Sequence, residues 1–130
     1  MHGETNLSAL LKTLKPGLNP GAYVFCMVND LSLINPVQPL MQFKEEEGFT
    51  VILRKEDADT LNLEYTFVAA WITLTVHSAL EAVGLTAAFS NALTAGGISC
   101  NVVAAFYHDH IFVAEKDAEK AMDILHRLSQ

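Results

Sequence analysis

The sequence has 130 residues, of which 51% are hydrophobic and 18% are charged, so the chain can bury a core and is not disordered. Its length fits one ordinary domain, or two small halves that share a core. The formal net charge of −7 argues against nucleic acids and anionic membranes, which require a basic face, and leaves a small molecule or a protein as the partner.

The N-terminal segment predicts a short amphipathic helix. Four leucines follow helical spacing and form one apolar stripe, at positions 7, 10, 11 and 14. The pair Pro16-Gly17 ends this helix. The segment lacks a basic region followed by a long apolar core, so it is not predicted to be a secretory signal.

Two features bear on the compartment of the protein. Residues 82–108 contain no Asp, Glu, Lys or Arg, but Ser, Asn, Thr and Gly interrupt the run and its period changes from helix to strand midway. We therefore predict no membrane-spanning segment. Cys26 and Cys100 stand alone in apolar segments, which indicates two buried, reduced thiols without a redox role. We expect a cytoplasmic protein.

The first half continues with a strand, a loop, a second strand and a short helix. The apolar run 22–28 has the length of a strand, and the proline-containing segment 29–43 predicts a loop with a short extended piece near 38–43. A second strand at 49–54 follows an acidic turn, and residues 55–61 predict a short helix.

The second half predicts the order strand, helix, strand, strand, helix. Residues 65–77 alternate as a long strand, and a helical stripe from Leu85 to Leu93 ends at Gly96-Gly97. Residues 98–106 alternate as a strand, "YHDH" (107–110) predicts a turn into the strand "IFVAE", and Asp117 is the predicted N-cap of a last helix. The core face of that helix is Ala118, Ala121, Met122, Leu125 and Leu128.

A weak internal duplication links the halves. The segments "EEGFTVILRKEDAD" and "HDHIFVAEKDAEKA" share an acidic turn, an apolar strand, a charged linker and an acidic helix start. A β-α-β-β-α-β unit needs a final strand, but the second half stops with its last helix. We infer that the halves share strands, and that the N-terminal strand, the apolar run 22–28, completes a sheet begun by the C-terminal half.

The strand-to-helix loop of the second half reads Glu81-Ala82-Val83-Gly84, and Gly97-Ile98-Ser99 follows about one helix later. This pattern resembles the ACT domain, a family of small regulatory modules whose first loop is usually Asp-x-Pro-Gly. The resemblance covers about residues 68–129, and the stretches "GLTA", "HDH" and "EEEG" are similar to small bacterial tandem-ACT proteins. It implies an α+β, ferredoxin-like sandwich of duplicated βαββαβ units, with an ACT-like half at 1–64 and an ACT domain at 65–130.

The resemblance also implies a function. ACT domains bind a small ligand, most often an amino acid, between the first loop of one ACT unit and a strand of a neighbour. The predicted binding residues are Glu81, Val83, Gly84, Leu85, Thr86, Asn101 and Asp109. Backbone N–H groups at the start of the helix suit a carboxylate, because the helix dipole contributes about 0.3–1 kcal/mol there. Glu81 or Asp109 is then expected to pair with the ammonium group.

Each of these residues also has a purely structural interpretation. Gly84 allows the chain to turn, Thr86 caps a helix, and Glu81 is a solvated loop carboxylate. Asn101 either bonds a backbone group at the sheet edge or contacts the ligand, and the sequence leaves both open.

His108 and His110 form the most conspicuous polar cluster. They share a strand face and suit a metal, with His77 or Glu81 as the third ligand. However, Asp and His are ordinary residues in a turn, and the spacing of a structural zinc site is absent. We therefore predict no metal and no cofactor.

The sequence carries no nucleophile elbow, Walker loop, dinucleotide fingerprint or HExxH helix, so we predict a protein that is not an enzyme. Three functions remain distinguishable: an amino-acid-binding regulatory module, a ligand-free oligomerisation or adaptor module, and a metal-dependent enzyme built on His108 and His110. A homodimer is expected in either of the first two, because an open sheet leaves edges that a second copy can cover.

Overall fold

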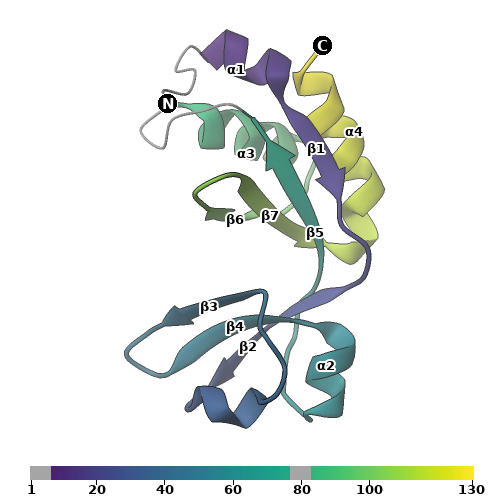
Figure 1. The fold of residues 1–130 in the computed structure, drawn as a ribbon. Coiled ribbons are helices and arrows are strands. Elements are labelled where there is room, and N and C mark those ends of the chain that lie inside the picture. The colour runs from purple at the N-terminus through teal and green to yellow at the C-terminus, as the bar shows by residue number, and fades with distance from the viewer. Residues whose placement is uncertain (1–6, 77–82) are drawn as a thin grey trace. The chain divides into compact units, whose positions relative to one another are not determined.

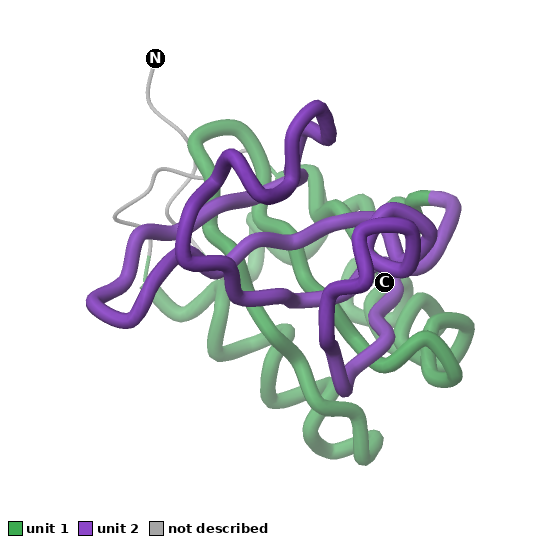
Figure 2. The backbone as a smooth tube through the Cα atoms, turned by 90° about the horizontal axis from the view of Figure 1, so that it is seen from below, with its two compact units in different colours: residues 1–19, 71–130 green, residues 20–70 purple. Residues whose placement is uncertain are grey.

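The computed structural model describes residues 7–76 and 83–130, and its helices and strands appear in Figure 1. The chain forms two compact units: residues 1–19 with 71–130 (unit 1) and residues 20–70 (unit 2), coloured separately in Figure 2. The N-terminal segment therefore belongs to the same unit as the C-terminal half of the chain.

Unit 2 is a complete βαββαβ unit. Its elements are, in chain order, β2 (Tyr23–Val28), the 3-10 helix η1 (Leu31–Ile34), β3 (Met41–Lys44), β4 (Phe49–Arg54), α2 (Lys55–Thr60) and the start of β5 (Val68–Thr75). The strands pair in the order β3-β4-β2-β5, and all of these pairs are antiparallel. One face of this sheet packs with η1 and α2 around a core that includes Val24, Cys26, Val51, Leu53 and Ala58.

Unit 1 has the same strand order but takes its fourth strand from the chain start. After β5 come α3 (Leu85–Ala95), β6 (Asn101–Ala104), β7 (Asp109–Ala114), the 3-10 helix η2 (Glu115–Asp117) and α4 (Ala118–Leu128). The helix α1 (Leu7–Thr13) and the strand β1 (Lys15–Leu18) precede unit 2 in the sequence. The strands pair in the order β6-β7-β5, and β1 pairs antiparallel with β5.

Strand β5 serves both units. Its first residues, Val68 and Ala69, pair with β2 as the last strand of unit 2, whereas Ile72 to Thr75 pair with β1 in unit 1. This confirms the α+β class, the duplicated ferredoxin-like units and the sharing of strands. The predicted donor was wrong: the strand that completes the sheet of unit 1 is β1, and residues 22–28 are the first strand of unit 2.

The sequence suggests only a helix end at β1, because Pro16 and Gly17 are poor strand formers. Proline is tolerated in a strand at a sheet edge, where its missing N–H costs no ladder hydrogen bond. Pro16 lies opposite Leu74 in this edge strand. A Cβ atom at Gly17 would lie 3.9 Å from the carbonyl oxygen of Thr73, an ordinary contact distance, so the strand does not need glycine at this position. Because the residues of β1 do not favour a strand by themselves, we infer that the pairing with β5 determines it.

Two other local predictions differ from the structure. The turn before β7 lies at residues 105–108, where the N–H of Ala105 donates to the carbonyl of His108 at 3.0 Å, so Asp109 and His110 belong to the strand. The predicted loop at 29–43 contains η1, whose N-cap Asp30 accepts a hydrogen bond from the N–H of Ser32 at 2.9 Å. The extended piece that was expected near 38–43 is β3.

The core of unit 1 lies between its sheet and its helices. On β5 the side chains of Ala70, Ile72 and Leu74 are buried, while Trp71, Thr73 and Thr75 on the other face are half-buried, which confirms the predicted alternation. Helix α3 packs against α1 and α4, and α4 also packs against β1 and β7. The side chains that these helices bury include Leu10, Leu85, Phe89, Leu93, Ala121 and Leu125.

Cys26 is buried and Cys100 is half-buried, and both are free thiols. Burial raises the pKa of both thiols, so both favour the protonated, unreactive form. In the part of the chain that is described, no helix combines the length and the apolar composition that crossing a bilayer requires.

Candidate functional site

The predicted ligand loop precedes α3 in unit 1. Val83 is 84% exposed, and Gly84 is the N-cap of α3 with a φ of +94°, a conformation that favours glycine. The carbonyl of Gly84 accepts the first helical hydrogen bond from the N–H of Ala88 at 2.9 Å. Gly84 has no side chain that can cap the helix, and the first turn carries no acidic residue. The positive end of the helix dipole therefore has no compensating acid within that turn.

Helix α1 lies beside this loop. A Cβ atom at Gly84 would come within 3.4 Å of Cδ2 of Leu7, the first residue of α1. This is an ordinary contact with the end of a flexible side chain, so the backbone conformation, and not Leu7, favours glycine here. That conformation accounts for Gly84 without a ligand, so the glycine alone does not identify a site.

The other predicted binding residues are placed differently. Leu85 is 4% exposed and belongs to the core, whereas Thr86 is exposed on the first turn of α3. The side-chain amide of Asn101 donates to the carbonyl of Phe112 at 3.2 Å, which agrees with its structural interpretation as a partner of the backbone. Glu81 lies outside the described residues.

Asp109 is half-buried at the start of β7, opposite Ala104 of β6. The pKa of its carboxyl group is raised, because the effect of burial exceeds the opposing effect of the neighbouring His110. Asn101 lies opposite Phe112, and residues 109 and 112 point to opposite faces of the same strand. The β6-β7 hairpin therefore does not bring Asn101 and Asp109 together on one face.

A polar cluster that the sequence does not predict lies on the face of unit 1's sheet that carries Trp71. The indole Nε1–H of Trp71 donates to Nδ1 of His110 at 3.0 Å, and Oγ1 of Thr73 lies 3.3 Å from the same nitrogen. The side-chain amide of Asn19 donates to Oγ1 of Thr73 at 2.9 Å and to the carbonyl of Trp71 at 3.2 Å. The alternation of β5 places Trp71 and Thr73 on one face. The third residue of the cluster, His110, was not predicted there because "YHDH" predicts a turn, whereas His110 lies in β7.

The protonation state of His110 follows from these contacts. A ring nitrogen that accepts the indole N–H carries no proton, so Nδ1 is unprotonated here. Burial lowers the pKa of His110, and the charge of His108 lowers it further, against an opposing effect of Asp109. The rings of His108 and His110 lie 6.2 Å apart between centroids. Nowhere in residues 7–76 and 83–130 do three His, Cys, Asp or Glu side chains gather closely enough to hold a metal ion, and the suggested third ligands, His77 and Glu81, lie outside these residues.

Trp71 is the only tryptophan of the chain, so its fluorescence reports directly on His110. On acidification we expect the fluorescence to fall in one step, because the imidazolium loses the indole hydrogen bond and quenches the ring. The midpoint should lie below 6.5, the ordinary pKa of histidine, because the pKa of His110 is lowered. A steady-state fluorescence titration, with circular dichroism to confirm that the protein stays folded, measures this midpoint.

The same shift fixes how stability depends on pH. Folding favours the neutral ring of His110, because its pKa is lower in the folded protein than in the unfolded chain. The contribution of His110 to the free energy of unfolding is therefore complete above pH 6.5, and it is lost as the pH falls from there through the folded-state pKa. His110→Gln should abolish the fluorescence step. His108→Gln should keep the step and move it to higher pH, because one neighbouring positive charge is removed. A step that persists in His110→Gln would contradict this assignment.

Two ACT-domain family models match the chain in tandem, at residues 2–70 and at residues 67–127. The chain belongs to the ACT-domain family. A Vibrio cholerae protein described as being of unknown function and a possible transport protein is 47% identical to this ACT protein. That match covers 95% of this chain and 96% of the other, with a TM-score of 0.88.

Two more distant structures share the fold of this ACT protein. An Agrobacterium tumefaciens protein is 17% identical over 89% of each chain, with a TM-score of 0.68. The ligand-free regulatory subunit of aspartate kinase from Thermus thermophilus is 9% identical over 91% of this chain and 99% of that one, with a TM-score of 0.62. No curated protein matches the sequence. ACT domains as a family are regulatory, ligand-binding modules.

Proposed function

We propose that this ACT protein is a regulatory module that binds an amino acid at the first turn of α3. Membership in the ACT family, through two tandem domains, is the observation that carries the proposal. The shared fold of an aspartate kinase regulatory subunit supports a regulatory role by analogy. A protein of this kind responds to its ligand and needs no catalytic residues of its own.

The chemistry of the α3 terminus supports the same proposal. The first turn of α3 offers backbone N–H groups and the exposed Thr86, with no acidic side chain among them. A ligand carboxylate placed there gains about 0.3–1 kcal/mol from the helix dipole, and its hydrogen bonds to the N–H groups add to this. Glu81 or Asp109 is the proposed partner of the ammonium group.

A thermal-shift screen against the twenty standard amino acids tests the proposal. Because a ligand that binds only the folded state stabilises it, a concentration about 100 times the Kd raises the free energy of unfolding by about 2.7 kcal/mol. The expected result is a saturable rise in Tm of several degrees for one amino acid or a few related ones. The Kd values of the hits then follow from calorimetry.

A matched pair of variants locates the site. Thr86→Glu places a negative charge in the first turn of α3, where it favours the helix but repels a carboxylate, so we expect the Kd to rise about tenfold or more, about 1.4 kcal/mol, without loss of stability. Thr94→Glu adds the same charge near the other end of α3, at another exposed threonine, and should leave the Kd unchanged. Equal effects of the two variants would contradict a site at the first turn.

The proposed function also includes a homodimer, which light scattering after size-exclusion chromatography measures. A stable dimer that no amino acid stabilises would contradict ligand binding and favour the adaptor function instead. The screen and the mass measurement together therefore decide between the two functions.

A further inference from the structure

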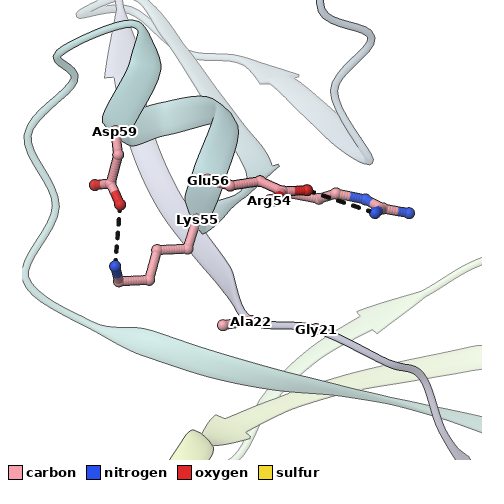
Figure 3. Close-up of a pocket in the computed structure, with 6 residues that line it drawn as sticks. All are labelled: Gly21, Ala22, Arg54, Lys55, Glu56 and Asp59. Carbon is pink, nitrogen blue, oxygen red and sulfur yellow. Dashed lines mark hydrogen bonds and ion pairs between the residues drawn. The ribbon is translucent and has the colours of Figure 1, made fainter.

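A pocket of about 300 Å³ opens in unit 2, and none of its lining residues belongs to the proposed α3 site. It lies where the chain enters β2 and where β4 runs into α2, and Figure 3 shows the residues that line it: Gly21, Ala22, Arg54, Lys55, Glu56 and Asp59. The N–H of Lys55 donates to the carbonyl of Ala22 at 2.9 Å, which joins the two segments. A Cβ atom at Gly21 would meet nothing closer than the ring of Tyr23, at 3.9 Å, so no side chain crowds the pocket at Gly21.

The four charged residues of the pocket balance one another. Arg54 and Lys55 bring two positive charges, and Glu56 and Asp59 bring two negative ones. A simple anion entering the pocket would meet both carboxylates, and a simple cation would meet both basic groups. A small molecule that carries both charges, and is neutral overall, avoids either repulsion.

One of the two ion pairs is fixed by several contacts. Nζ of Lys55 lies 3.0 Å from Oδ2 of Asp59, and the hydroxyl of Tyr65 donates to Oδ1 of the same carboxylate at 2.5 Å. These hydrogen bonds lower the pKa of Asp59, and the bond to Asp59 raises the pKa of Lys55. Both oxygens of Asp59 are thus engaged within the protein.

The other pair is loose. Nη1 of Arg54 lies 3.8 Å from Oε1 of Glu56, and the two side chains are 63% and 76% exposed. Figure 3 shows this pair extending from the junction of β4 and α2 in a different direction from the Lys55–Asp59 pair. An exposed ion pair at this distance contributes little to stability, so a ligand can open it at little cost. Arg54 offers a bidentate donor for a carboxylate, and Glu56 offers an acceptor for an ammonium group.

We propose that this pocket binds the zwitterionic head of a small amino acid, with the carboxylate on Arg54 and the ammonium on Glu56. The site lies in the first ACT domain, whereas the proposed α3 site lies in the second, and neither depends on the other. The protein then has one site in each unit, and two ligand molecules bind to each chain.

Amide chemical shifts of labelled full-length protein test the proposal, with each of the twenty standard amino acids as the probe at millimolar concentration. We expect at least one to shift the amides of residues 21, 22 and 54–56 in a saturable manner. Acetate and methylammonium at the same concentration should shift these amides far less. Arg54→Gln should raise the Kd about tenfold or more, because a charge-assisted pair is lost.

Arg127→Gln is the matched control, because Arg127 is the other arginine of the chain and is exposed on α4 of unit 1. It should leave the Kd at the pocket unchanged, and so should Thr86→Glu, which tests the α3 site separately. The proposal is overturned if no amino acid shifts these amides, if acetate alone shifts them as strongly, or if Arg54→Gln binds as tightly as the original protein.

Discussion

Replacing Phe89 by alanine is expected to lower the free energy of unfolding by about 3–5 kcal/mol. Phe89 is 0% exposed in the middle of α3, the helix that follows the proposed ligand loop. The substitution removes the buried ring and leaves a cavity that close-packed neighbours fill only in part. Urea unfolding followed by far-ultraviolet circular dichroism measures the change.

Asn91→Ala provides the control on the same helix. Asn91 is exposed, so this change should alter the free energy of unfolding by no more than about 0.5 kcal/mol. A loss below about 1 kcal/mol for Phe89→Ala would show that α3 is not packed as described. In that case the first turn of α3 would not be held rigidly enough to present its N–H groups to a ligand.

The strongly periodic segments could be predicted from the sequence alone. Strands β2, β4 and β5 and helix α3 carry apolar patterns long enough to identify each element without its neighbours. Strand β1 has no such pattern, because Lys-Pro-Gly-Leu becomes a strand only through its pairing with β5. The order of elements in the second half predicts that its sheet needs one more strand from elsewhere in the chain. The sequence points to residues 22–28 for this strand instead of β1, because residues 22–28 have the stronger strand pattern.

The candidate sites show the same limit. Gly84 and Thr86 could be placed at a helix start because glycine and helical period coincide there. The Trp71–His110 contact could not be predicted, because it depends on the register of two strands that are 39 positions apart in sequence. The pocket of unit 2 also lacks a motif: Gly21 and Arg54 are brought together by the pairing of β2 with β4. Local patterns identify elements, and pairing over long separations creates sites.

The place of the N-terminal helix α1 in unit 1 predicts a second large loss of stability on mutation. The sequence-based division at 64/65 assigns α1 to the first half, whereas the compact units group it with residues 71–130. Leu10 of α1 is 0% exposed, and α1 packs against α3. Leu10→Ala is expected to lower the free energy of unfolding by about 2–5 kcal/mol, since it removes a buried side chain.

Amide hydrogen exchange under native conditions shows which unit loses this stability. If α1 stabilises unit 1, the amides of α3, α4 and β7 should lose most protection, while those of β2 and β4 keep more of theirs. Ser8→Ala, at an exposed position of the same helix, should change neither set. An equal or larger loss in β2 and β4 would instead favour the division at 64/65. The N-terminal segment would then be part of the first ACT domain, and β1 alone would link it to the second.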